Sequence, residues 1–374
     1  MKFFVTVARI LTGVLFIFSG LVKAIDPKGL AFKMQEFFEA WSGSGFMPGL
    51  MKTFDEYGLA FSIMMITLEV IVGVALLIGW KKKITTSVLL LLMIFFTFLT
   101  SYVLFTGKIR ACGCFGDCIP LTPVQTFSKD IVLIILAFLL LLNTKYISPI
   151  AKPFFSFLYI LSATILILLL QWYVLRNLPL IDCLPYKKGN NLIELRKMPY
   201  NAKPDKYDYV FIYKKDGSQK EFKADATPDS SWEFVDRKQT LTQKGNNNIP
   251  VINDFSLTTE SGTDTTNDIL NNKEEYYLLY IKELDTYPKK WDEDILLMNR
   301  FLSAGKKIMV VTSQLTPVKD RMKKIDKKYI SNLIFLTCDA TVMKTVARVN
   351  PTLYFMNGPV VKNKWSWTVF KNLN

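Results

Sequence analysis

Residues 84–105 read ITTSVLLLLMIFFTFLTSYVLF and contain no charged side chain. An α-helix rises about 1.5 Å per residue, so roughly 20 apolar residues cross the hydrocarbon core of a bilayer. This stretch therefore predicts a membrane-spanning helix and places the chain among membrane proteins.

Four further apolar segments predict the same structure: residues 4–22, 59–80, 127–142 and 154–175. Segment 127–142 is the shortest and carries Lys129 and Asp130 near its start, which is typical of a tilted or partly buried helix; we expect these two residues to form an interfacial pair. No small-x-small cleavage site follows the first segment, so we expect a helix there and not a removed signal peptide.

The distribution of lysine predicts the orientation. Loops 1–3, 81–83 and 143–153 hold a dense set of lysines, whereas loops 23–58 and 105–126 spread theirs over many more residues. Short, positively charged loops stay in the cytoplasm. We therefore expect a cytoplasmic N-terminus and, after five spans, a C-terminal half outside the cytoplasm. With only four spans that half would be cytoplasmic.

The composition excludes several kinds of chemistry. The 374 residues have a net charge of +14 and a mean hydropathy of +0.23, averaged over an apolar half and a polar half. The chain has no histidine, which excludes Ser-His-Asp and Cys-His catalysis and histidine-ligated metals. The second half contains no helix with clustered basic residues, so we expect no nucleic-acid partner. The positive charge suits lipid headgroups or acidic proteins.

The polar half predicts two modules. Residues 207–223 alternate polar and apolar side chains around Lys215-Asp216-Gly217 and predict a β-hairpin. From residue 252 strands and helices alternate, which predicts an α/β sheet with parallel strands and a final antiparallel hairpin. The expected strands are 276–281, 307–312, 334–337, 352–356 and 360–365, and the expected helices are 291–304 and 317–328. The expected domains are a bundle over 1–150, a fifth spanning helix over 151–176, a β-rich segment over 177–248 and an α/β domain over 249–374.

The candidate chemistry lies in one loop. Cys112, Cys114 and Cys118 occur in ACGCFGDC, directly after the third predicted span. A Cys112–Cys114 disulfide would close a small, strained and labile ring, whereas Cys118 would pair with either of them under less strain. A static disulfide that staples the loop remains an equal alternative.

Cys183, shortly after the fifth predicted span, widens the choice. It could be a resolving thiol for the loop, an unpaired cysteine, or the fourth ligand of a zinc ion together with the three loop cysteines. The spacing C-x-C-x3-C is a poor tetrahedral set, and we therefore predict no metal site.

The membrane half resembles a known family. ARILTGVLFIFSGLVKAIDP (8–27), LEVIVGVALLIGW (68–80), CGCFGD (112–117) and TFSKDIVLI (126–134) resemble DoxX/MauE-like membrane proteins over residues 1 to about 150. The resemblance implies a four-helix core similar to that of vitamin K epoxide reductase and DsbB. It also implies a bacterial inner-membrane protein whose C-terminal half lies in the periplasm. The implied role is in thiol redox or in maturation of exported proteins, with quinone as the candidate electron acceptor. Cys118 departs from the usual pattern of the family.

Glu69 lies near the middle of the second predicted span. A carboxylate there is costly unless it is neutral or paired, so it should face the bundle interior. It is a candidate proton acceptor for thiol or quinone chemistry. The alternative is a structural hydrogen bond to Arg9, Ser19 or Lys23.

Residues 249–367 resemble the TlpA/peroxiredoxin branch of the thioredoxin fold. The resemblance rests on IPVINDFSLTTESGTDTTNDIL (249–270), YYLLYI (276–281) and NPTLYFMNGPVVKNKW (350–365), and it places Pro351 at the cis-proline position. The segment KELDTYPKKWDEDI (282–295), which should carry C-x-x-C, has no cysteine, so this domain cannot exchange thiols itself. The resemblance implies a partner surface around Asp285, Tyr287, Trp291 and Pro351. We expect Cys338 to be a buried, inert thiol.

Two functions follow as hypotheses. The first is a membrane protein of envelope thiol–disulfide exchange or maturation, in which Cys112, Cys114 and Cys118 react with a client held by the C-terminal domain. The second is a non-catalytic accessory or scaffold subunit of an envelope complex for secretion or respiration.

Overall fold

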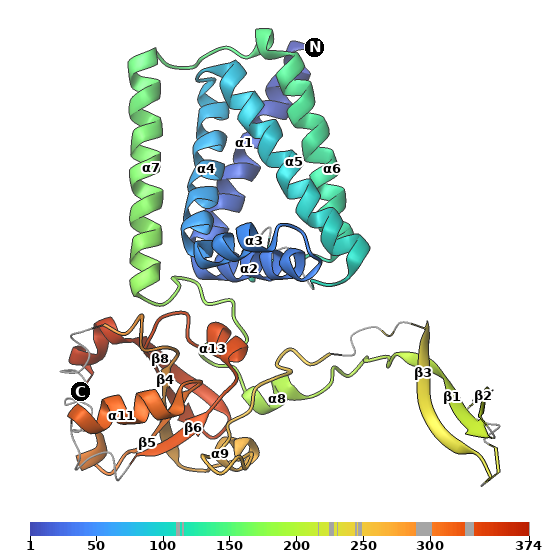
Figure 1. Ribbon diagram of the computed structural model, residues 1–374. Helices are drawn as coiled ribbons and strands as arrows, with labels where there is room; N and C mark the ends of the chain where they lie inside the picture. The colour runs from blue at the N-terminus through green and yellow to red at the C-terminus, as the bar shows by residue number, and fades with distance from the viewer. Residues whose placement is uncertain are drawn as a thin grey trace.

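The computed structural model describes residues 1–109, 113, 116–215, 217–223, 228–229, 231–243, 245, 249–288, 301–325 and 333–373. A helical bundle and an α/β domain lie one beneath the other in Figure 1, and a small β-sheet extends away from both.

Five helices are long and apolar enough to cross a membrane: α1 (Lys2–Ala24), α4 (Gly58–Ile78), α5 (Lys82–Thr106), α6 (Pro123–Leu142) and α7 (Pro153–Arg176). The prediction of five spans is confirmed at this level. Helix α6 begins four residues before the apolar segment that predicted it, because Thr122 and Gln125 form a capping box and Pro123 occupies the first turn. It is therefore as long as a span requires.

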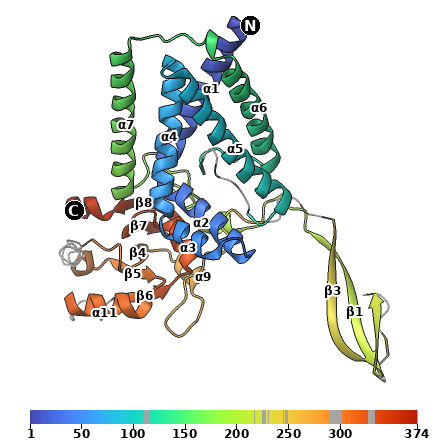
Figure 2. The same ribbon diagram turned by 45° about the horizontal axis from the view of Figure 1, so that its top comes forward.

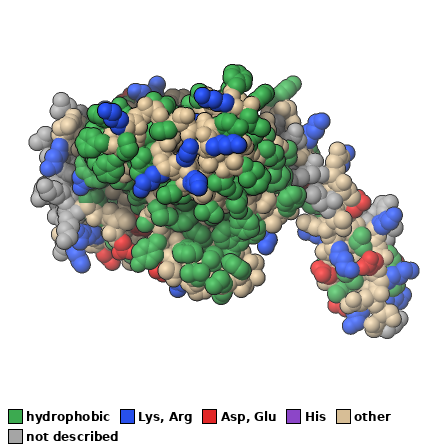
Figure 3. Space-filling model, turned by 90° about the horizontal axis from the view of Figure 1, so that it is seen from above, with side chains coloured by type: hydrophobic (Ala, Val, Ile, Leu, Met, Phe, Trp, Pro, Cys, Tyr) green, Lys and Arg blue, Asp and Glu red, His purple; other side chains and the backbone are tan. Residues whose placement is uncertain are grey.

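The bundle is held by close helix contacts and by one buried arginine. A Cβ atom added to Gly73 of α4 would lie 2.9 Å from the carbonyl oxygen of Gly13 of α1, so these helices need glycine to approach so closely. Arg9 of α1 donates hydrogen bonds to the carbonyl oxygens of Leu76, Leu77 and Ser148. A short 3-10 helix, Thr144–Tyr146, follows α6. Figure 3 looks onto this end of the molecule and shows Lys and Arg side chains spread over it.

Two helices lie across the opposite end of the bundle, next to the α/β domain: α2 (Pro27–Gly43) and α3 (Pro48–Glu56) (Figures 1 and 2). Asp26 begins α2 by accepting a hydrogen bond from the Gly29 backbone N–H over 3.1 Å. The apolar side of α2 buries Met34, Phe37 and Phe38 against the bundle. Its other side faces the α/β domain.

The α/β domain contains a five-stranded sheet with the order β6-β5-β4-β7-β8. Strands β4 (Glu275–Ile281), β5 (Lys307–Thr312) and β6 (Ile334–Thr337) are parallel. Strands β7 (Thr352–Asn357) and β8 (Val360–Ser366) form the final antiparallel hairpin. All five predicted strands and their directions are confirmed. The buried side chains of β4 alternate between two apolar clusters, one on each face of the sheet.

The helices around this sheet were predicted less well. Helix α11 (Leu315–Ile325) matches the expected helix 317–328 within the described residues, whereas α9 (Thr266–Leu270), α13 (Ala340–Val346) and the terminal 3-10 helix Trp367–Asn372 were not expected. Most of the expected helix 291–304 lies outside the described residues, apart from its end at 301–303.

A separate antiparallel sheet contains β1 (Lys206–Lys215), β2 (Ser218–Lys223) and β3 (Glu233–Gln243) in the order β2-β1-β3. The predicted hairpin 207–223 is confirmed, and β3 was not predicted. The segment that precedes this small sheet belongs to the α/β domain. Tyr186 is buried in the core of that domain, and so is Leu192, the first residue of α8 (Leu192–Arg196). The small sheet is therefore an insertion in the α/β domain, although the sequence grouped residues 177–248 as one segment.

Candidate functional site

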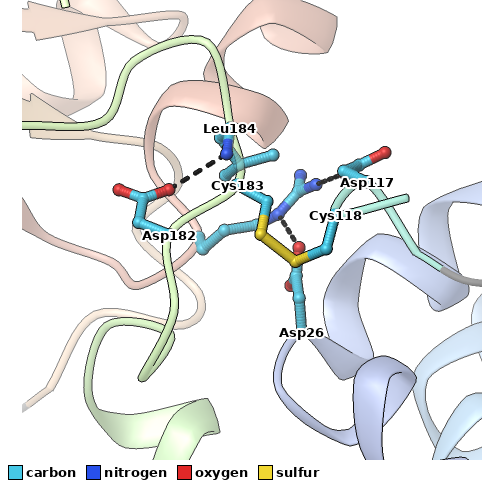
Figure 4. The surroundings of a disulfide bond; sticks show 7 residues. Asp26, Asp117, Cys118, Asp182, Cys183 and Leu184 are labelled. Carbon is cyan, nitrogen blue, oxygen red and sulfur yellow. Dashed lines mark hydrogen bonds and ion pairs between the residues drawn. A yellow bond between two sulfur atoms is a disulfide. The ribbon is translucent and has the colours of Figure 1, made fainter. Parts of the chain in front are cut away.

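A disulfide joins the two halves of the chain. Cys118, in the loop between α5 and α6, is bonded to Cys183, in the segment between α7 and α8. Both residues are partly exposed. Figure 4 shows the bond at the junction of the bundle and the α/β domain, with Asp26 and Asp117 beside it.

Each of the bonded cysteines follows an aspartate that pairs with a cation of the α/β domain. Asp117 accepts a hydrogen bond from Arg348 Nη2 over 3.1 Å. Asp182 forms an ion pair with Lys364 of β8, and it also accepts a hydrogen bond from the Leu184 backbone N–H. These contacts hold both segments of the disulfide against the same domain.

Arg348 is the centre of this junction. Only 6% of the residue is exposed, and its guanidinium also donates to Asp26 Oδ2 over 2.7 Å and to the Lys344 carbonyl oxygen over 2.6 Å. Lys28 of α2 donates a hydrogen bond to the Arg348 carbonyl oxygen over 2.6 Å. Burial, and after it the nearby Lys282 charge, lower the pKa of Lys28 to about 8, against the opposing effect of Asp26.

Phe32 of α2 forms the second part of the junction. Its ring lies 5.6 Å from Lys282 Nζ, 5.4 Å from Lys344 Nζ and 5.3 Å from the Arg348 guanidinium carbon. Three cations on one partly buried ring are attracted by its quadrupole, each by about 0.5–2 kcal/mol. Since Lys282 follows the last residue of β4, this end of the sheet faces α2.

The structure therefore settles part of the cysteine question. Cys118 is bonded to Cys183, and not to Cys112 or Cys114 as the loop spacing favoured. Cys112 and Cys114 lie outside the described residues. In this oxidised form Cys118 and Cys183 are not thiolates, so two of the four candidate zinc ligands are already used.

Glu69 is paired with Lys23 inside the bundle. Lys23 Nζ lies 2.9 Å and 2.7 Å from the two carboxylate oxygens, and both residues are buried. The structural alternative is thus realised with Lys23, while Arg9 bonds to backbone carbonyls. A role for Glu69 as proton acceptor stays a prediction.

A small cavity lies beside this ion pair. It is lined by Ser19, Lys23 and Glu69 from one side and by Lys129 and Asp130 from the other. Asp130 lies 2.6 Å from Lys129 Nζ, so these two residues pair as expected. Asp130 is fully buried inside the bundle, however, and is not at an interface. The cavity volume of about 20 Å³ holds roughly one water molecule and does not fit a quinone headgroup.

The predicted partner surface is only partly described. Asp285 is exposed, Tyr287 is partly buried, and Pro351 is buried after a cis peptide bond with Asn350. Trp291 lies outside the described residues. Binding of a partner there stays a prediction.

Cys338 is a free, buried thiol, as expected. Burial, together with the neighbouring Asp339 carboxylate, raises its pKa to about 12. It is therefore protonated and unreactive at neutral pH.

Sequence reasoning did not find Phe32, Asp26 or Arg348. The one available signal was the dipeptide Asp-Cys, which occurs at 117–118 and again at 182–183. Nothing in the local sequence of Arg348 indicates that it reaches a segment more than 300 residues away.

Comparisons with known proteins support the resemblance that was expected for the membrane half. Residues 1–143 match the family described as methylamine utilisation protein MauE, and residues 207–244 match a domain of unknown function, DUF8463. Protein TlpB of Flavobacterium psychrophilum is 36% identical over 89 residues, which are 23% of this chain and 24% of TlpB. The chain thus aligns with only about a quarter of that relative. No solved structure matches. The family match and the five long apolar helices together identify a bacterial membrane protein with a MauE-like N-terminal part.

Proposed function

We propose that this chain is a thiol–disulfide exchange protein of the bacterial inner membrane that acts on exported proteins at the periplasmic side. The observation that carries the proposal is the Cys118–Cys183 disulfide. It is partly exposed, it lies where the bundle meets the α/β domain, and Cys112 and Cys114 precede it by a few residues in the same loop.

The exchange would proceed by two thiolate attacks. A client thiolate attacks one sulfur of the Cys118–Cys183 bond, forms a mixed disulfide and releases the other cysteine as a thiolate. A second client thiolate then attacks the client sulfur of the mixed disulfide and releases the remaining cysteine. The client loses two electrons and becomes a disulfide, and Cys118 and Cys183 gain them as thiols. A disulfide between Cys112 and Cys114 would reoxidise the pair by the same chemistry.

A pulse of reductant in living cells tests this relay, which is the transfer of electrons from Cys118 and Cys183 to Cys112 and Cys114. Cells are treated briefly with dithiothreitol and washed, and Cys118 and Cys183 are trapped with a thiol-alkylating reagent at intervals. The Cys112→Ser/Cys114→Ser variant should re-form the Cys118–Cys183 bond more slowly than the unchanged protein. Cys338→Ser is the matched control, because that thiol is buried and should not affect the rate. Equal rates in all three proteins would contradict the relay.

We infer a thioredoxin-like fold for the α/β domain. Its strand order, with three parallel strands followed by an antiparallel hairpin at the other edge, supports this inference. Residues 282–295, which directly follow β4, contain no cysteine. The domain would therefore hold the disulfide and a client but would not itself exchange thiols.

The second candidate function is an accessory subunit of an envelope complex. The insertion β1–β3 favours it, because this sheet extends away from both other parts in Figures 1 and 2 and exposes Phe234 and Val235. Exposed apolar residues on an isolated sheet are typical of a protein-binding surface. Phe234→Ser/Val235→Ser should then lose proteins that co-purify in mild detergent, with Cys112→Ser/Cys114→Ser as the control that retains them. Identical co-purified proteins in both variants would contradict this role for the sheet.

A further inference from the structure

A wide cavity near the disulfide lies between α2 of the bundle and α13 of the α/β domain. Its volume is about 580 Å³, which falls within the range of protein binding sites. Lys33 and Glu36 line it from α2, Thr341 and Lys344 from α13, and Cys183 lines it between the two helices.

The two cysteines of the disulfide share one cavity, but they differ in their contact with the wide one. Cys183 lines the wide cavity and also a second, narrow one of about 20 Å³. Cys118 lines the narrow cavity, together with Gly113, the residue between Cys112 and Cys114. Among the described residues, therefore, Cys183 is the cysteine of the bond that lines the space wide enough for a large ligand.

The walls of the wide cavity suit a polypeptide. Lys33 is paired with Glu36 over 2.9 Å, and Glu39 and Lys344 add one charge of each sign. Threonine side chains and Phe32 lie among them. Charges of both signs beside hydroxyl and aromatic groups can satisfy the donors and acceptors of a peptide backbone. A lipid tail would need apolar walls, and a small anion would need cations alone.

We propose that this cavity binds an extended, cysteine-containing segment of a client protein, and that the client thiolate attacks Cys183 and releases Cys118. This inference rests on the proposed thiol exchange and adds its binding site and its direction. The client–Cys183 mixed disulfide forms as the Cys118–Cys183 bond breaks, and the electron pair leaves on Cys118. A second client thiolate then attacks the client sulfur of this mixed disulfide, which completes a client disulfide and releases Cys183 as a thiolate.

A blocking substitution tests the cavity. Thr341 is exposed at the second position of α13, so Thr341→Trp would fill the space without displacing core residues. Thr316→Trp is the matched control, because Thr316 is exposed at the second position of α11 and does not line the cavity. Purified, oxidised full-length protein in detergent is mixed with either dithiothreitol or a reduced ten-residue peptide with two cysteines, and loss of the Cys118–Cys183 bond is followed over time.

We expect Thr341→Trp to slow reduction by the peptide at least about tenfold, equivalent to about 1.4 kcal/mol, while leaving reduction by dithiothreitol unchanged. Thr316→Trp should change neither rate. An unchanged peptide rate in Thr341→Trp would overturn the assignment of the cavity and leave the proposed exchange intact. If dithiothreitol reduces the bond in every protein and the peptide reduces it in none, the proposed exchange itself fails.

A second measurement uses the unchanged protein and does not depend on the folding of a variant. A peptide with one cysteine is added, the mixture is quenched with acid, and the mixed disulfide is located by mass spectrometry. The peptide should be attached to Cys183. Attachment to Cys118 would overturn the assigned direction.

Discussion

Arg348 of the α/β domain donates a hydrogen bond to Asp26 of the bundle over 2.7 Å, although 322 positions separate them in the chain. The same guanidinium reaches Asp117, which directly precedes the disulfide. Ion pairs and a disulfide thus connect the bundle and the α/β domain at the same junction. The ion pairs should keep the two parts docked while the disulfide is reduced.

Arg348→Met should remove this second attachment. Loss of one partner from a mostly buried ion pair costs about 3 kcal/mol, since the remaining carboxylates lose their cation. After reduction of the disulfide, amide hydrogen exchange in α2 should be faster in the variant than in the unchanged protein. Lys238→Met, which breaks an exposed pair with Glu221, is the control. Equal protection of α2 in all three proteins would refute the attachment.

Phe32→Leu should weaken the junction while keeping an apolar side chain. Because three cations lie near the ring, we expect a loss of about 1–3 kcal/mol of docking free energy. Hydrogen exchange of α13 in the reduced protein reports this loss. Phe46→Leu changes an exposed ring of the same half and should have no effect. An effect of equal size from Phe46→Leu would show that the ring's cations are not the cause.

The Lys23–Glu69 pair should behave as a unit. Lys23→Met or Glu69→Gln alone leaves one buried polar partner and should cost roughly 3–5 kcal/mol of bundle stability, whereas the double variant should recover most of that loss. Thermal unfolding in detergent measures all four proteins. Additive losses in the double variant would mean that the two residues do not depend on each other.

Docking should also strengthen between pH 8 and about 10.5. Lys28 has a pKa of about 8 in the docked form and an ordinary value of about 10.5 when the halves separate. In this range Lys28 therefore takes up a proton when the halves separate, so a higher pH disfavours separation. The free-energy cost of burying the Lys28 ammonium is fully present below pH 8 and disappears as the pH rises to about 10.5.

The measurement uses the Cys118→Ser/Cys183→Ser variant, so that no thiol of the pair titrates. The docked fraction, followed by hydrogen exchange of α2 and corrected for the intrinsic exchange rate, should rise with pH. Addition of Lys28→Met should abolish most of the rise. A docked fraction that falls as the pH rises, in the disulfide-free variant that retains Lys28, would contradict the lowered pKa of Lys28.

Much of the fold was predictable because local patterns decide it. Long apolar runs gave all five membrane helices, and period-two alternation gave the hairpin β1–β2. Strand β3 was missed because its eleven residues carry mixed polar side chains and lie apart from the core.

The site was less predictable for a physical reason. The Cys118–Cys183 bond depends on how α2 docks against α13, and that docking depends on single side chains such as Phe32 and Arg348. Such contacts leave no periodic signal in the sequence. The spacing of the loop cysteines, by contrast, pointed to bonds within the loop.

The central claim is that the Cys118–Cys183 disulfide is exchanged in the cell and is not a permanent staple. Membranes containing the protein should be equilibrated with thiol–disulfide buffers of known potential, and the bonded fraction quantified by alkylation and mass spectrometry. Since both cysteines are partly exposed, the account predicts a midpoint above about −300 mV, where exchangeable disulfides lie. A bond that stays fully oxidised below that potential would contradict the account.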